Sequence, residues 1–276
     1  MRKINKINIT ETSYEIFENI VSSKRWENKI LLDWISSEIK DLYKNFIDNE
    51  SELFNMNPKW YNLDTKDALI HCYESDTTLT KSYKHKIKSL EDRKCPYCYL
   101  ENSSQVEHYL PKDEFPEFSF MIDNLFPCCS TCNTKKWTNW RDLTSRIILN
   151  FYSDLIPEEQ FLYVDLIIID NIPIVEFKID TSKIIIDSMI EKILYKHIER
   201  LNLLNRYSES INNYISELKN RVRLSKWITE SGIRSLCKDE SEVKRLTYGN
   251  NYFVTVLYDE ISRNDGMIEL LFRDNF

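Results

Sequence analysis

The sequence predicts a mixed α+β protein, in which a mainly helical scaffold carries a small zinc-stabilised insert and a short β-hairpin. Apolar residues recur at three- and four-residue steps over long stretches near both ends of the chain, as on amphipathic helices. Two Cys-x-x-Cys pairs lie in the middle of the chain, with a spacing typical of zinc sites. After them, two apolar segments meet at Asp170-Asn171, a pattern that favours a hairpin.

The composition of the chain excludes several classes of protein. Of the 276 residues, 42% are hydrophobic and 13% are aromatic, so the chain can build a folded core. It has only three glycines, widely scattered, and therefore no phosphate-binding loop or dinucleotide fingerprint. The sequence carries no apolar segment typical of a membrane span or secretion signal. Four of the seven cysteines belong to metal-type pairs, so we expect a reducing, cytoplasmic environment.

Residues 1–90 are predicted to form a helical N-terminal region. The segment from Thr12 to about Asn55 is expected to be helical, because its apolar residues repeat at helical spacing. These residues are Leu31, Ile35, Ile39, Leu42 and Phe46. Asn57-Pro58 ends this segment, because proline cannot continue a helix. Two more helices are expected before the first cysteine pair, at Thr65–Glu74 and Lys81–Leu90.

Residues 146–276 are predicted to form a β-hairpin followed by a helical C-terminal region. The two strands are expected at Phe161–Ile169 and Ile174–Ile179. Helices are expected from Ser182 to about Leu224 and again over Trp227–Phe276. The first of these tracts carries a near-heptad stripe of Leu204, Tyr207, Ile211, Tyr214, Leu218 and Val222. Such a stripe is typical of a bundle core, and the alternative is a coiled-coil contact with a partner.

The middle region, residues 91–145, contains the predicted zinc site. Its four ligands are Cys95, Cys98, Cys129 and Cys132. Four thiolates complete the tetrahedral shell of Zn²⁺ and leave no open position, so this zinc is interpreted as structural. Two alternatives are weaker: His108 could replace one cysteine, or Cys128 could replace Cys129. The spacing of Cys129 and Cys132 repeats that of the first pair, which makes Cys128 the spare thiol.

The polar residues between the two cysteine pairs resemble the HNH nucleases, a family whose fold is the ββα-metal motif. The family pattern has an acidic-His pair closing the first strand, an Asn opening the second, and an Asn or His on the helix that follows. Glu107-His108, Asn124 and Asn133 match these positions, and the cysteine pairs match the zinc-bearing branch. The resemblance covers about forty residues. The family usually has Asp where this chain has Glu107.

The resemblance assigns a role to each of these residues. His108 would be the general base that takes a proton from the attacking water. Glu107 and Asn133 would hold Mg²⁺ or another divalent cation through oxygen atoms. Asn124 would tie the loop between the strands and so orient His108. The alternative for Glu107 is an ordinary surface carboxylate. The short helix of the motif is expected at Asn133–Trp140, with Trp137 and Trp140 as core residues rather than base-stacking residues.

The charge distribution bears on the substrate. The formal net charge is −7, which is unfavourable for tight nucleic-acid binding by bulk charge. Basic residues nevertheless cluster around the motif, and they form either a solvated face or a phosphate-contacting strip. Those before the motif are Lys81, Lys84, Lys86, Lys88, Arg93 and Lys94. Those after it are Lys135, Lys136, Arg141 and Arg146.

Two functions are therefore considered. The first is an HNH endonuclease that hydrolyses phosphodiester bonds, with DNA favoured over RNA as the substrate. The second is a catalytically degenerate zinc-ribbon adaptor that binds nucleic acid or protein. The layout also resembles the nuclease subunits of bacterial anti-phage systems such as Septu, which work beside an ATPase. That resemblance implies a protein partner, which could be an ATPase.

Overall fold

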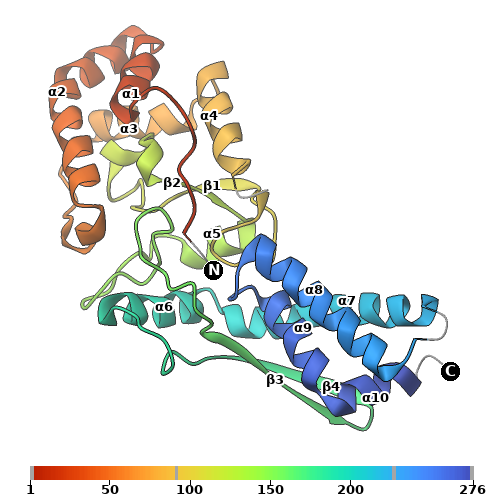
Figure 1. Ribbon diagram of the computed structural model, residues 1–276. Helices are drawn as coiled ribbons and strands as arrows, with labels where there is room; N and C mark the ends of the chain where they lie inside the picture. Colours follow the sequence, from red (N-terminus) through yellow and green to blue (C-terminus); the bar gives the residue numbers. More distant parts are fainter. Residues whose placement is uncertain (1–2, 91–92, 226–227, 274–276) are drawn as a thin grey trace. The chain divides into compact units, whose positions relative to one another are not determined.

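The computed structural model describes residues 3–90, 93–225 and 228–273 (Figure 1). Two compact units are present: Lys3–Asp154, here called the N-terminal unit, and Leu155–Phe276, here called the C-terminal unit. Each unit combines helices with a two-stranded antiparallel sheet. The predicted mainly helical α+β class is thus confirmed. Our division at residues 90 and 145 is a different partition of the chain and stays a prediction.

Helices open the N-terminal unit, and side-chain caps define where several of them begin. These elements are α1 (Ser13–Ser22), α2 (Trp26–Asp48), η1 (Glu50–Asn55), α3 (Leu63–Glu74) and α4 (Thr78–Lys88). Thr12 and Glu15 form a capping box at α1, and Asn62 and Thr77 cap α3 and α4. The helical segment predicted from Thr12 to Asn55 is interrupted at Ser23, which ends α1 and whose hydroxyl donates to the Ile20 carbonyl.

The long helix α2 buries one face against the site-bearing part of the unit. Leu32, Ile39 and Phe46 are fully buried, and the Phe46 ring lies edge-on to Phe118, 5.2 Å between centroids. The predicted stripe is therefore shifted, since Leu31, Ile35 and Leu42 are only half-buried. This packing holds the loop that contains Phe118, which connects the two strands of the sheet.

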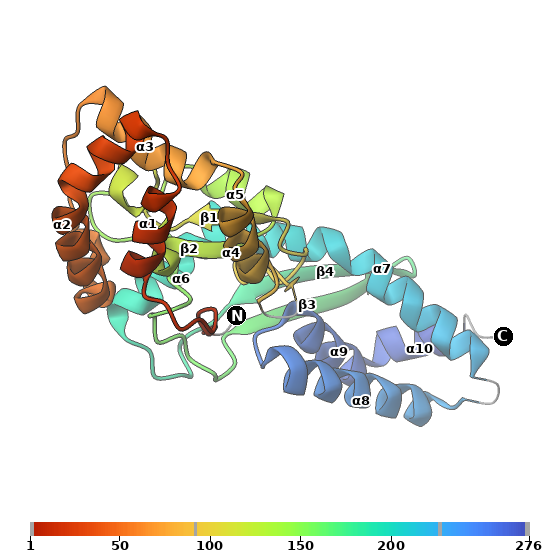
Figure 2. The ribbon, with the colours of Figure 1, turned by 90° about the horizontal axis from the view of Figure 1, so that it is seen from above.

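A strand–strand–helix arrangement follows the four helices. Strand β1 (Gln105–His108) pairs antiparallel with β2 (Leu125–Cys128), so that Glu107 lies opposite Phe126 and His108 opposite Leu125. The connection contains two 3-10 turns, η3 (Pro116–Phe118) and η4 (Ile122–Asn124), and α5 (Ser130–Lys136) comes next. Helix α4 packs beside both strands (Figures 1 and 2). Helix α5 ends four residues earlier than predicted, because Trp137 leaves the helical conformation with φ 49° and ψ −127°.

The C-terminal unit is built on the predicted hairpin. Strands β3 (Leu162–Ile169) and β4 (Ile172–Ile179) join through Asp170 and Asn171, both with positive φ as a tight two-residue turn requires. The helices are α6 (Ser188–Arg200), α7 (Leu203–Leu224), α8 (Glu230–Tyr248), α9 (Phe253–Arg263) and α10 (Asp265–Arg273). Trp227 and Phe276, the predicted limits of the last helical tract, lie outside the described residues.

The near-heptad stripe of α7 lies inside the C-terminal unit. Tyr207, Ile211, Leu218 and Val222 are buried, and α7 packs along β4 (Figure 2). Tyr207 stacks on Phe253 of α9 with 4.9 Å between ring centroids. The bundle-core interpretation therefore describes this stripe, and it is not a free surface for a coiled-coil partner. Among the described residues, no helix combines the length and apolarity that crossing a membrane requires.

Candidate metal-dependent active site

The four predicted zinc ligands form one buried cluster. The Sγ atoms of Cys95, Cys98, Cys129 and Cys132 all lie within 4.8 Å of one another. The Cys98 and Cys129 sulfurs are 3.8 Å apart. A tetrahedron with Zn–S bonds of about 2.3 Å has edges of about 3.8 Å, so the donor set fits zinc. Cys129 also caps α5, because its sulfur accepts a hydrogen bond from the Cys132 N–H.

Neither alternative ligand belongs to this cluster. Cys128 is buried next to it, but its sulfur is outside the group of four. The His108 ring is engaged elsewhere: its Nε2 lies 2.9 Å from the Ser119 carbonyl oxygen. A carbonyl can only accept, so Nε2 carries the proton and Nδ1 is the basic nitrogen of the neutral ring. Burial lowers the pKa of His108 to about 3, which keeps the imidazole neutral at physiological pH.

Glu107, the neighbour of His108 on β1, is paired with a buried lysine. The Lys136 ammonium donates to Glu107 Oε1 at 2.5 Å and to the His108 carbonyl at 2.8 Å. Glu107 is 6% exposed and Lys136 is fully buried. Burial raises the pKa of Glu107, and the nearby Lys136 charge opposes that rise. Glu107 is thus no ordinary surface carboxylate.

The two asparagines of the motif have different surroundings. Asn133, on α5, donates from Nδ2 to Gln105 Oε1 at 2.5 Å, which leaves its carbonyl oxygen as a possible metal ligand. Asn124 is fully buried, and its side chain bridges the loop after β1. Its Oδ1 accepts from the Leu110 N–H at 2.7 Å, and its Nδ2 donates to the carbonyls of Leu110 and Phe118.

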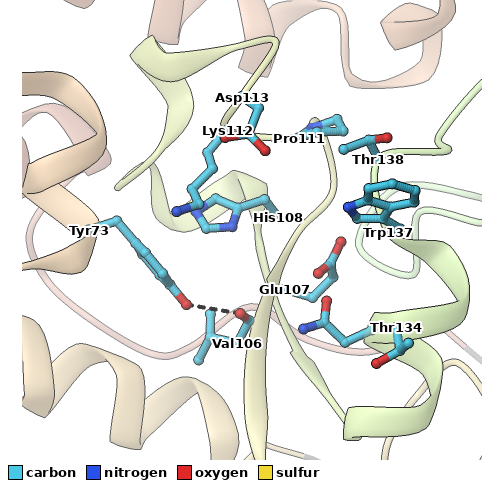
Figure 3. A pocket seen from close by; sticks show the side chains of 11 residues that line it. Tyr73, Val106, Glu107, His108, Pro111, Lys112, Asp113, Thr134, Trp137 and Thr138 are labelled. Carbon is cyan, nitrogen blue, oxygen red and sulfur yellow. Dashed lines mark hydrogen bonds between the residues drawn. The ribbon is translucent and has the colours of Figure 1, made fainter. Parts of the chain in front are cut away.

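A cavity of about 520 Å³ brings three of the four motif residues together (Figure 3). Its wall includes Glu107, His108 and Asn133, whereas Asn124, at the end of η4, is not part of the lining. The full lining is Tyr73, Val106, Glu107, His108, Pro111, Lys112, Asp113, Asn133, Thr134, Trp137 and Thr138. Figure 3 shows the His108 ring on the side of Tyr73 and Lys112, and the Glu107 carboxylate directed toward Trp137.

The predicted basic strip is only partly a surface feature. Lys136 and Arg146 are internal, and Arg146 forms a two-point ion pair with Asp154 at 2.7 and 3.0 Å. The part before the motif is different. Lys84 and Lys88 of α4 line a second hollow of about 350 Å³ that shares Tyr73, Val106 and Asn133 with the cavity. Lys84 and Lys88 therefore place positive charge on the α4 side of the site.

Sequence reasoning missed two contributors to this geometry. Lys136 was counted as one cation of a strip, although it lies three residues after Asn133 and therefore shares a helix face with it. That spacing was a usable signal. Ser119 offers only a backbone carbonyl to His108, and no side-chain pattern in the sequence marks such a contact.

Comparison with known proteins gives two partial matches. A segment of 55 residues is 42% identical to the Septu protein PtuB of Bacillus thuringiensis, covering 18% of this chain and 21% of that protein. A segment of 41 residues is 44% identical to protein ea31 of Escherichia phage lambda, covering 14% of each chain. The chain therefore matches only about a fifth or less of the length of these relatives. No protein-family model and no solved structure matches the chain.

Proposed function

We propose that the chain is a metal-dependent endonuclease of the HNH type that hydrolyses nucleic-acid phosphodiester bonds. The observation that carries the proposal is the single cavity lined by Glu107, His108 and Asn133. It holds a neutral imidazole beside two groups with oxygen donors. This is the set that hydrolysis of a phosphodiester needs: a base for water and ligands for a cation.

His108 is the general base in this proposal. Its Nε2–H is held by the Ser119 carbonyl, so Nδ1 is the nitrogen that accepts the proton of the attacking water. Asn124 is a positioning residue, because its hydrogen bonds to Leu110 and Phe118 brace the loop that supplies Ser119. Base help from a group with a pKa near the working pH contributes roughly 10²- to 10⁴-fold to rate. Burial lowers the pKa of His108 to about 3, so we expect its contribution at the lower end of that range.

Glu107 and Asn133 are the proposed ligands of a hard divalent cation such as Mg²⁺. Lys136 binds Glu107 Oε1, which leaves Oε2, and Gln105 binds Asn133 Nδ2, which leaves Oδ1. When bound, the cation would neutralise charge on the scissile phosphate and stabilise the leaving oxygen. Zinc in the cysteine cluster would have a structural role, fixing α5 and with it Asn133.

We further propose that the chain acts in bacterial anti-phage defence with a protein partner. The partial match to a Septu protein supports this. The net charge of −7 also supports it, because a chain with few accessible cations gains little affinity from phosphate contacts alone. Four residues of the α7 stripe, Tyr207, Ile211, Leu218 and Val222, are buried, so a partner would dock on another surface. Cleavage and its salt dependence should be compared for the chain alone and with the product of the adjacent gene.

One observation favours the second candidate, a catalytically degenerate zinc-ribbon adaptor. Glu107 is almost fully buried and already neutralised by Lys136, as in a structural ion pair. An adaptor with such a pair would bind nucleic acid or protein without a divalent cation. The two candidates therefore differ in their dependence on metal.

A cleavage assay distinguishes them. Plasmid and single-stranded DNA are incubated with the full chain in Mg²⁺, in EDTA, and in EDTA followed by excess Mg²⁺, with zinc content measured each time. We expect Mg²⁺-dependent products, their loss in His108→Ala, and their retention in His85→Ala. His85 is a matched control because it is exposed on α4 and lines neither hollow. Binding without cleavage under all metal conditions would leave the adaptor as the better description.

A further inference from the structure

Trp137 occupies an unusual place at the mouth of the candidate site. Trp137 is 73% exposed, and it lines the cavity with Glu107 and His108 (Figure 3). We expected Trp137 and Trp140 to be core residues. Trp140 is a core residue, because only 2% of it is exposed. The expectation for Trp137 is wrong. Exposure alone assigns no role, since Trp34 is also exposed, but Trp137 differs from Trp34 in lining the cavity.

The backbone at Trp137 has a conformation that a large side chain rarely adopts. The Asn139 N–H donates to the Lys136 carbonyl at 3.0 Å, which closes a four-residue turn with Trp137 as its second residue. With φ 49° and ψ −127°, Trp137 has nearly the geometry of the first central position of a type II′ turn. Glycine is the residue that adopts this conformation without strain, and a large side chain there is unfavourable. The chain thus keeps an exposed tryptophan where glycine would suit the fold better.

Cations and aromatic rings surround the approach to Trp137. Lys84 lies 4.1 Å from the centroid of the Tyr73 ring, and Tyr73 contacts the His108 ring edge-on at 4.3 Å. The smaller hollow with Lys84 and Lys88 neighbours the cavity, because both are lined by Tyr73, Val106 and Asn133. A strand that lay across both hollows would meet Lys84 and Lys88 on one side and Trp137, across the cavity from Tyr73, on the other (Figure 3).

We propose that Trp137 stacks on a nucleobase beside the scissile phosphate, so that the substrate is a strand with an unpaired base at the cleavage point. This inference rests on the proposed nuclease function and names its substrate class. A base inside a duplex has both faces covered by its neighbours, so stacking on Trp137 requires a single-stranded, frayed or mismatched position. Stacking of this kind tolerates every base, because each presents an aromatic face.

The test measures binding separately from hydrolysis. In the full-length chain carrying His108→Ala, Trp137 is changed to Ala, Gly or Phe. Anisotropy then gives Kd for a fluorescein-labelled oligothymidylate of about 12 nucleotides, an abasic strand of equal length, and a matched duplex. Trp34→Ala is the control, since Trp34 is 88% exposed on α2 and lines neither hollow.

We expect Trp137→Ala and Trp137→Gly to weaken oligothymidylate binding by roughly 5- to 150-fold, with Trp137→Phe close to the parent. Binding of the abasic strand should not change. Trp137→Gly should also melt at or above the parent temperature, because glycine relieves the turn. The last result separates a binding role from a structural one, since a residue needed for the fold would lower the melting temperature.

Each outcome bears on one proposal or the other. Oligothymidylate binding by Trp137→Ala equal to that of Trp34→Ala overturns the stacking role, as does the absence of any binding by the parent. A Trp137→Ala variant that loses as much affinity for the abasic strand as for oligothymidylate also overturns the stacking role. Trp137-dependent binding by a chain that never cleaves supports stacking and overturns the nuclease function. Metal-dependent cleavage together with binding that does not depend on Trp137 supports the nuclease function and overturns the stacking role.

Discussion

Replacing Lys136 by Met tests whether the buried ion pair with Glu107 is what keeps a charged carboxylate at the cavity wall. The change removes the ammonium and its hydrogen bonds to Glu107 Oε1 and the His108 carbonyl, but keeps an apolar stem of similar length. Both partners are nearly free of solvent. Removing one partner of such a pair leaves an uncompensated buried charge, which typically costs about 3–5 kcal/mol of unfolding free energy.

The loss of stability in Lys136→Met should depend on pH, and the titration of Glu107 decides whether the loss grows or shrinks as pH rises. Burial raises the pKa of this carboxyl in the folded state, and Lys136 counteracts the rise. Without Lys136 the folded-state pKa rises further above its unfolded value. The protonated form is then tolerated at low pH, whereas the penalty grows as pH rises. Lys136→Met should therefore lose more stability near pH 8 than near pH 5, by roughly 1.4 kcal/mol for each unit of added shift.

Urea unfolding of zinc-loaded protein at both pH values measures this effect. Lys135→Met is the matched control, because Lys135 lies on the same helix, half-exposed, and should change stability by less than about 0.5 kcal/mol. The double variant Lys136→Met with Glu107→Gln should recover most of the loss, since no charge is left unpaired. Equal losses for Lys135→Met and Lys136→Met, or a double variant as unstable as the single one, would refute the reasoning.

Three further results are expected. Cys98→Ser should lower both bound zinc and the melting temperature, because thiolate binding is coupled to local folding; zinc analysis that finds no metal in the parent contradicts this. Asn133→Ala should raise the Mg²⁺ concentration for half-maximal cleavage more than it weakens DNA binding, and an unchanged metal titration would place the second ligand elsewhere. Glu117→Gln should stabilise the protein above pH 7 by up to about 3 kcal/mol and leave it unchanged near pH 4, measured by urea unfolding. Burial raises the pKa of Glu117 to about 7, so the folded state bears a penalty for the charged form that grows between the unfolded and folded pKa values.

Local sequence rules account for most of the fold. The α+β class, the hairpin at Asp170-Asn171 and the helices of both units follow from periodicity and turn chemistry, which act over a few residues. The cysteine cluster follows from ligand spacing, because Zn²⁺ restricts which thiols can share one shell. The residues of the HNH pattern were also named from the sequence, and their chemical roles stay predictions.

Tertiary packing decided which side of each element meets the core, and that information is not local. The sequence allows the α7 stripe to be either a core or a partner surface. In the structure, α9 packs against it and makes it part of the core. Lys136 was expected to be a surface cation. It is the buried partner of Glu107, because α5 packs against β1. Trp137 is exposed rather than buried in the core, because the chain turns sharply after Lys136. A side chain's chemistry is written in the sequence, but its solvent exposure and its partners depend on contacts between segments far apart along the chain.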